Sequence, residues 1–241
     1  MLDPASGGES RGLLGLTQTE RPFAWWGPLG RPVHAHGLDD LVAGSVLPAA
    51  LATILAEAVK RGASLVVVAG PSGAGKTTLL SALLERLSAT TRRVHIRGCY
   101  EPFDFRREPE SAAGTILLIN EISAHLPVYL WGPGVRRVLQ AGLAGYQLAA
   151  TAHAFNAQEF VASLAGYPLR VPLAEIVAFH LVVALDAWND GTEIHREVRE
   201  VTALRATFQG LEPRTLALRP TRGAPMRIDH HGWDEVLARL D

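Results

Sequence analysis

The apolar positions of the chain alternate between short continuous runs and segments with helical spacing. Ser64–Ala69 is a continuous run rich in valine, as expected of a parallel strand covered on both faces. Behind a glycine-rich turn, leucines recur at helical spacing from Leu79 to Leu87. Further apolar runs at 93–97, 115–119 and 147–151 alternate with helical patterns at 134–143 and 156–165. This order predicts an α/β fold with an open, mostly parallel sheet flanked by helices.

The segments on either side of this region carry their own signals. A short helical pattern begins at Leu38, and Pro48 suits the first turn of a helix that runs to about Lys60. Later in the chain, His180–Leu185 has the pattern of a strand, and Asp190-Gly191 is a good hairpin turn before a second run at 193–201. The sheet is therefore expected to finish with an antiparallel edge hairpin.

Length and composition favour one domain with additions at both ends. A chain of 241 residues that is 48% hydrophobic has enough apolar side chains for one sizeable core. Residues 1–33 show no sustained period, and we expect an irregular segment in which Trp25 and Trp26 dock onto the domain, with stacking on a ligand ring or a subunit contact as the alternatives. Residues 34–204 are expected to form the domain. Residues 205–241, rich in proline and with a helical pattern from Trp233, are expected to pack on it as an extension.

Charge and cysteine content narrow the environment. The formal net charge of -1 gives no general attraction to nucleic acid or to acidic membranes, so no direct nucleic-acid binding is expected. Cys99 is the only cysteine, which excludes an intrachain disulfide and suits a reducing compartment. Charged or polar residues interrupt every apolar stretch before the span of about 20 residues that crosses a membrane. The sequence thus predicts a cytoplasmic protein.

The strongest chemical signal is a phosphate-binding loop between a predicted strand and a predicted helix. It is the segment Gly70-Pro71-Ser72-Gly73-Ala74-Gly75-Lys76-Thr77-Thr78. Its glycines permit backbone conformations in which successive N–H groups point at phosphate oxygens, and the helix N-terminus adds its positive dipole end. Lys76 is expected to bridge the terminal phosphates of ATP, and the Thr77 hydroxyl is expected to ligate Mg²⁺.

An acidic residue follows a second apolar strand. Glu121 comes directly after the strand 115–119 and Asn120, where a carboxylate can act as the general base that activates water. Asn120 occupies the position of a metal-binding aspartate in many P-loop proteins, so Mg²⁺ would rest on Thr77, phosphates and waters. A glutamate at this position also caps helices, and that alternative stays open.

A histidine and two arginines complete the candidate site. His153 ends the apolar strand 147–151 at the carboxyl edge of the sheet, where it lies beside the expected ligand and suits contact with the γ-phosphate. A packed core histidine is the alternative. Arg106 and Arg107 are candidates for an arginine supplied across a subunit boundary, although a surface pair has the same pattern.

Taken together, these elements resemble the ATPases of type II and type IV secretion and pilus assembly, most nearly the tight-adherence pilus branch. The similarity covers about residues 36–204. It rests on the lead-in Leu38–Gly44, the Walker A segment Gly70–Leu80, Ile119-Asn120-Glu121-Ile122 as Walker B, Thr151-Ala152-His153-Ala154 as the histidine box, and a closing hairpin that ends in Arg199-Glu200-Val201.

The resemblance implies a RecA-like motor domain that hydrolyses ATP with Mg²⁺, in a homo-oligomeric, commonly hexameric ring at the cytoplasmic face of membrane-embedded secretion or pilus components. Glu101 is the only match to the family's acidic box and would assist catalysis. The family's arginine two residues after the Walker B glutamate is Ser123 here. The segment before Walker B is also shortened, so turnover is expected to be slow.

Two other function classes remain open at this level. One is an interaction module that ATP binding switches with little or no turnover, which the eroded acidic box and Ser123 favour and Glu121 and His153 oppose. The other is a P-loop kinase for a small molecule, for which the segment after Glu121 offers no clear lid. An ABC-type ATPase is excluded, because Leu143–Gln147 resembles its signature loop only superficially.

Overall fold

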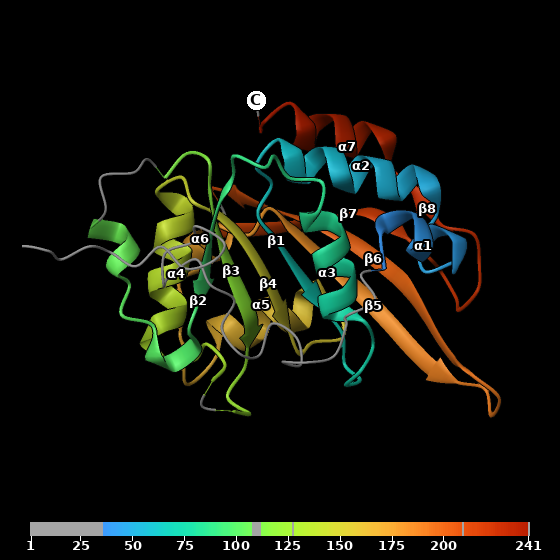
Figure 1. Cartoon of the computed structure of the whole chain (residues 1–241), viewed down its shortest axis with the longest axis horizontal. Coiled ribbons are helices and arrows are strands. Elements are labelled where there is room, and N and C mark those ends of the chain that lie inside the picture. The colour runs from blue at the N-terminus through green and yellow to red at the C-terminus, as the bar shows by residue number, and fades with distance from the viewer. Residues whose placement is uncertain (1–35, 108–111, 127, 209, 241) are drawn as a thin grey trace, which may run out of the picture.

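The computed structural model describes residues 36–107, 112–126, 128–208 and 210–240. An eight-stranded sheet in the order β2-β3-β4-β1-β5-β6-β7-β8 forms its centre, as Figure 1 shows. The pairs from β2 to β5 are parallel and those from β5 to β8 antiparallel. The strands are β1 Leu65–Val68, β2 Arg92–Ile96, β3 Thr115–Ile122, β4 Gln147–Ala152, β5 Leu181–Asn189, β6 Ile194–Thr207, β7 Gly210–Leu218 and β8 Arg227–Ile228.

Helices cover both faces of the sheet, which confirms the predicted fold class (Figure 1). The helices are α1 Leu38–Ala43, α2 Ala49–Lys60, α3 Lys76–Leu84, α4 Pro133–Leu143, α5 Ala157–Ala165, α6 Leu173–Ile176 and α7 His230–Leu237. The short 3-10 helices η1 Gly98–Tyr100 and η2 Asp104–Arg107 lie between β2 and β3. No helix of the described ranges is both long and apolar enough to span a membrane.

The central strand β1 shows why its sequence has no alternation. Leu65 and Val67 enter the core formed with α1, α2, α3 and α7, whereas Val66 and Val68 enter the core formed with α4, α5 and α6. All four side chains are fully buried, so every position along the strand must be apolar. The strand therefore anchors the segment that follows it against both layers.

The end of the sheet differs from the prediction. The expected hairpin is present as β5 and β6, but β6 continues to Thr207, and β7 and β8 extend the sheet beyond it. Pro213 lies within β7, opposite Leu204. Since β8 pairs only with Ala217 and Leu218, β7 has a free edge at Pro213, and a residue without an N–H is tolerated there.

Three predictions fall wholly or partly on residues outside the described ranges. They concern the irregular segment 1–33, its tryptophans Trp25 and Trp26, and the start of the domain at residue 34.

A buried histidine on β2 predicts a pH dependence of stability. Burial, assisted by the nearby Arg93 charge, lowers the pKa of His95 from 6.5 to about 4. The unfolded chain therefore takes up this proton at a higher pH than the folded chain, and the free energy of unfolding should fall as the pH falls from 6.5 to 4. The full effect is about 3 kcal/mol, at about 1.4 kcal/mol per pKa unit.

The measurement is denaturant unfolding at a series of pH values. The slope of unfolding free energy between pH 6.5 and 4 should be shallower in His95→Gln than in the natural protein, and replacement of the exposed His36 is the control. Parallel profiles for the natural protein and His95→Gln would contradict the assignment.

Candidate functional site

The loop between β1 and α3 adopts the conformation that its glycines allow. Gly73 and Gly75 have φ angles of 76° and 90°, in the left-handed region that side chains rarely adopt. A Cβ on Gly73 would have no neighbour within 4 Å, so the backbone angle, rather than space, selects glycine there. Gly75 is the N-cap of α3, and the first N–H groups of that helix lack intrahelical partners. The local geometry is thus that of an anion-binding helix start.

An aromatic ring lies against the first glycine of the loop. A Cβ built on Gly70 would stand 2.1 Å from a ring carbon of Phe155, which belongs to the segment after β4. The Phe155 side chain is otherwise 66% exposed. No sequence pattern identifies this residue, because a lone phenylalanine has no spacing that links it to a loop 85 positions earlier.

Lys76 is the first residue of α3 and is only 8% exposed. Burial lowers the pKa of its ammonium group, and the nearby charge of Glu121 partly offsets that effect. The Lys76 Nζ and Glu121 Oε2 atoms are 4.0 Å apart, which is an ion pair without a close hydrogen bond. The ammonium group therefore sits in a poorly hydrated position with incomplete compensation, where an anionic ligand would be favourable.

Glu121 and His153 meet because β4 lies between β1 and β3 in the sheet. The His153 Nε2 and Glu121 Oε1 atoms are 2.9 Å apart. The contact does not have the geometry of a hydrogen bond, and Oε1 has no hydrogen-bond partner among the described residues. Glu121 is 8% exposed, so the structure brings together a buried carboxylate, a histidine and the Lys76 ammonium at one edge of the sheet.

Two neighbouring residues flank this group. Thr77 is exposed at the start of α3, beside Lys76. Asn120, just before Glu121, accepts a hydrogen bond from the Thr151 hydroxyl through its backbone carbonyl. This bond connects β3 to β4 immediately behind Glu121 and His153.

Glu101 is occupied elsewhere. It is buried, and its two carboxylate oxygens accept hydrogen bonds from the backbone N–H groups of Arg97 and Phe103 at 2.9 and 2.8 Å. The side chain thereby stabilises the turn of its own segment. Arg106 and Arg107 are exposed on η2, where Arg107 lies 3.5 Å from Asp104.

Two further residues, which the sequence patterns did not identify, reach the site. His125 lies four residues after Glu121, and its ring centroid is 5.1 Å from that of His153. Arg196 of β6 donates a hydrogen bond from Nε to the carbonyl of Gly73 at 3.1 Å. The spacing of His125 from Glu121 was a usable local signal. Arg196 had none, since the hairpin brings it back across 123 positions of sequence.

Arg196 should support ligand binding at the loop. Replacement by alanine removes a cation and the hydrogen bond that Arg196 donates to the Gly73 carbonyl. We expect the Kd for an ATP analogue to rise about fivefold, which corresponds to a loss of about 1 kcal/mol. Fluorescence titration of a labelled ATP analogue measures this. Arg199→Ala, an exposed change on the same strand, is the matched control, and equal effects in the two variants would contradict a specific role for Arg196.

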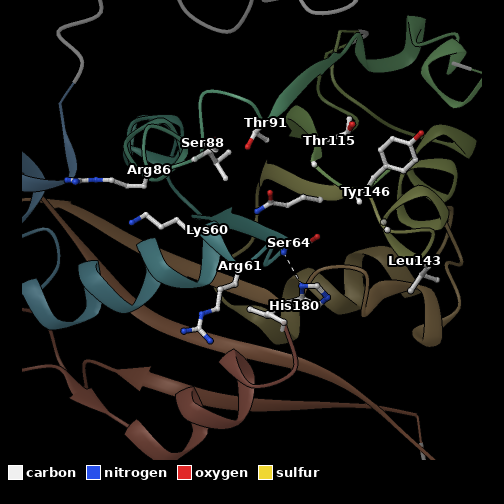
Figure 2. Close-up of a pocket in the computed structure, with 18 residues that line it drawn as sticks. Lys60, Arg61, Ser64, Arg86, Ser88, Thr91, Thr115, Leu143, Tyr146 and His180 are labelled. Carbon is white, nitrogen blue, oxygen red and sulfur yellow. Dashed lines mark hydrogen bonds between the residues drawn. The ribbon is translucent and has the colours of Figure 1, made fainter. Parts of the chain in front are cut away.

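A pocket lies elsewhere, at the amino ends of the parallel strands. Its volume is about 820 Å³, and Figure 2 shows Lys60, Arg61 and Arg86 around its rim. His180 lines it and accepts a hydrogen bond from the Ser64 N–H through Nδ1 at 3.0 Å, while burial lowers the pKa of the imidazole. The loop between β1 and α3 follows the carboxyl end of β1, so this pocket belongs to the opposite edge of the sheet.

The arrangement at the carboxyl edge has defined chemical capacities. The loop and Lys76 present backbone N–H groups and a buried positive charge to an anion. The Glu121 carboxylate has an oxygen free to accept a proton or bind a cation. The exposed hydroxyl of Thr77 lies next to Lys76, and the imidazole of His153 lies next to Glu121. Phosphoryl-transfer sites combine groups of these kinds.

Comparisons with known proteins give distant structural neighbours. No family model matches the chain, and no curated protein matches its sequence. The VirB11 ATPase of the Brucella suis type IV secretion system, solved in complex with sulphate, is 20% identical with a TM-score of 0.46, over 69% of this chain and 56% of that one. The Legionella pneumophila ATPase DotB is 16% identical with a TM-score of 0.40, over 70% of this chain and 51% of that one. The chain thus spans about half the length of these two proteins.

Proposed function

We propose that this protein binds and hydrolyses ATP in a Mg²⁺-dependent reaction. The observation that carries the proposal is the buried ammonium of Lys76 at the start of α3, with a carboxylate 4.0 Å away. A buried cation with so little compensation is costly unless a strong anion completes its surroundings. Gly73 and Gly75, whose φ angles are positive, direct N–H groups of the loop and of the helix start toward one position beside it. The β- and γ-phosphates of a nucleotide supply the matching negative charge.

The residues divide the chemistry among them. Lys76 and the N–H groups of Gly70–Thr78 hold the phosphates. The Thr77 hydroxyl, exposed beside them, is an oxygen donor of the kind that a hard divalent ion takes together with phosphates and waters, so Thr77 would hold Mg²⁺, which neutralises phosphate charge when bound. Glu121 accepts the proton of the attacking water. His153, 2.9 Å from Glu121, couples the γ-phosphate to that carboxylate.

Two features bear on the rate. Glu101, with both oxygens hydrogen-bonded to backbone N–H groups of its own segment, supplies no free base to this site. Arg196 is the arginine whose contacts reach the loop, whereas Arg106 and Arg107 lie on η2, in the segment before β3. The Arg196 guanidinium already donates a hydrogen bond to the Gly73 carbonyl, so we expect hydrolysis to be slow unless a second chain supplies an arginine.

The wider role follows from the motif resemblance over residues 36–204. We propose a motor of the secretion and pilus-assembly kind, in which a homo-oligomer couples its nucleotide state to assembly or transport at the cytoplasmic side of a membrane machine. The competing function is an ATP-switched interaction module with negligible turnover. Both carboxylate oxygens of Glu101 already accept backbone hydrogen bonds, and this favours the competing function.

The test is steady-state phosphate release from ATP by the purified protein, with and without Mg²⁺ and over a range of protein concentrations. Mg²⁺-dependent release whose specific rate rises with concentration is expected for an assembling ATPase. Tight ATP binding without release would replace hydrolysis by the interaction module. Absence of both would overturn the proposal.

A further inference from the structure

Three potential metal ligands converge beside the phosphate loop. They are Glu121 at the end of β3, His125 in the following turn and His153 after β4, and one donor atom from each lies within 4.8 Å of the others. The His125 and His153 rings meet edge to face with an interplanar angle of 68°. Neither histidine is fully buried, so the group can be reached from solvent.

The carboxylate of this group is incompletely satisfied. Glu121 is 8% exposed, and its Oε1 atom, which faces His153, has no hydrogen-bond partner among the described residues. The other oxygen, Oε2, faces Lys76 at 4.0 Å. A buried carboxylate oxygen without a partner costs free energy that a hydrogen bond or a bound cation recovers. The unpartnered oxygen is directed at the histidines.

The donor types select the class of ion. Two imidazoles and one carboxylate suit Zn²⁺ and similar transition-metal ions, whereas Mg²⁺ prefers oxygen ligands. We propose that Glu121, His125 and His153 form a binding site for a divalent transition-metal ion of the Zn²⁺ class, with an open fourth position toward the phosphate loop. Three protein ligands with one open position is the arrangement of reactive zinc sites.

The fit requires only a small movement. Tetrahedral zinc places its donor atoms about 3.3 Å apart, and Glu121 Oε1 and His153 Nε2 are already 2.9 Å apart. His125 is exposed and can close the remaining distance by rotation of its side chain. Its backbone N–H donates to the Ser123 hydroxyl at 3.1 Å, and the Leu130 N–H donates to the Glu121 carbonyl at 2.9 Å, so the start of the turn is fixed to β3.

A second group of similar composition has no carboxylate oxygen of this unsatisfied kind. Asp190, Glu193 and His195 cluster at the exposed tip of the β5–β6 hairpin. The Asp190 carboxylate already accepts hydrogen bonds from Thr192 and the Glu193 N–H, and it pairs with His195 at 2.5 Å. These bonds account for the strongly lowered pKa of Asp190 and leave no orphaned oxygen. The cluster therefore serves as a control.

A metal ion at the first group would block the proposed reaction. Coordination of Oε1 would withdraw negative charge from the carboxylate, so Glu121 would be a weaker base toward the attacking water. Transition-metal ions should therefore inhibit ATP hydrolysis. This consequence rests on the proposed function, whereas ion binding itself does not.

The experiment titrates Co²⁺ into the chelator-treated full chain without nucleotide and follows the visible absorption of four-coordinate cobalt. A single equivalent should produce the band, and Zn²⁺ should displace it. The affinity should fall at least about tenfold in His125→Ala, because one of three protein ligands is lost. Thermal melting of that variant checks folding, which should be unaffected since His125 is exposed.

Two matched variants locate the ion. His195→Ala removes the histidine of the hairpin cluster, and Cys99→Ser removes the exposed thiol; both should retain the cobalt band. No band in the natural protein, or an unchanged band in His125→Ala, would overturn the proposal. Phosphate release measured separately distinguishes the two failures: release without cobalt binding removes only the metal site, and cobalt binding without release removes only the ATPase function.

Discussion

Lys76→Ala is expected to abolish phosphate release and to weaken ATP binding by about ten- to a hundredfold. A charge-assisted hydrogen bond contributes about 1.5–3 kcal/mol, which corresponds to that range of affinity. Lys76 is buried in the first turn of α3, so solvent cations are poor substitutes for its charge. Isothermal titration with ATP and a steady-state phosphate assay measure the two effects.

Stability separates this loss from misfolding. Since burial, the larger influence, lowers the pKa of Lys76, its charged form is disfavoured in the folded chain. Lys76→Met, which keeps most of the volume, should therefore unfold at a temperature equal to or above that of the natural protein while still failing to hydrolyse ATP. Lys60→Ala, at the exposed end of α2, is the control and should retain activity. Full ATP affinity in Lys76→Met would rule out the loop as the phosphate site.

Glu121→Gln should lower the rate of phosphate release by about 10²- to 10⁴-fold, the usual contribution of a general base. ATP affinity should persist or rise, because the change removes a negative charge 4.0 Å from Lys76 without removing the side chain. The shape of the residue is kept, so folding should be retained. Phosphate release under single-turnover conditions isolates the chemical step, and titration with ATP reports binding.

The control for this change is Glu85→Gln, an exposed substitution at the end of α3. It should leave both rate and affinity unchanged. A Glu121→Gln protein that turns over at the natural rate would mean that another group activates water. Loss of ATP binding together with the rate would instead assign Glu121 to the positioning of Lys76.

Much of the architecture could be read from local sequence. The strand 64–69, the helix to Lys60 and the helices at 134–143 and 156–165 each correspond to an observed element, because burial imposes a helical period on the helices and a continuous apolar run on the strand. The strand β7 was missed, since Pro213 favours irregular structure in sequence and is accommodated here by an open strand edge. The length of β6 was likewise underestimated, because its partner could not be foreseen.

What the sequence determined by itself is the backbone conformation of the loop 70–75. Gly73 and Gly75 fulfil a requirement of their own backbone angles, and Lys76 follows at the helix start, so spacing alone specifies the geometry. The surroundings of that loop depended on the tertiary structure. Strand order decides that His153 meets Glu121, and the β5–β6 hairpin decides that Arg196 reaches Gly73. Such contacts join residues that no local period connects, because the pairing of strands is settled by packing across the whole sheet.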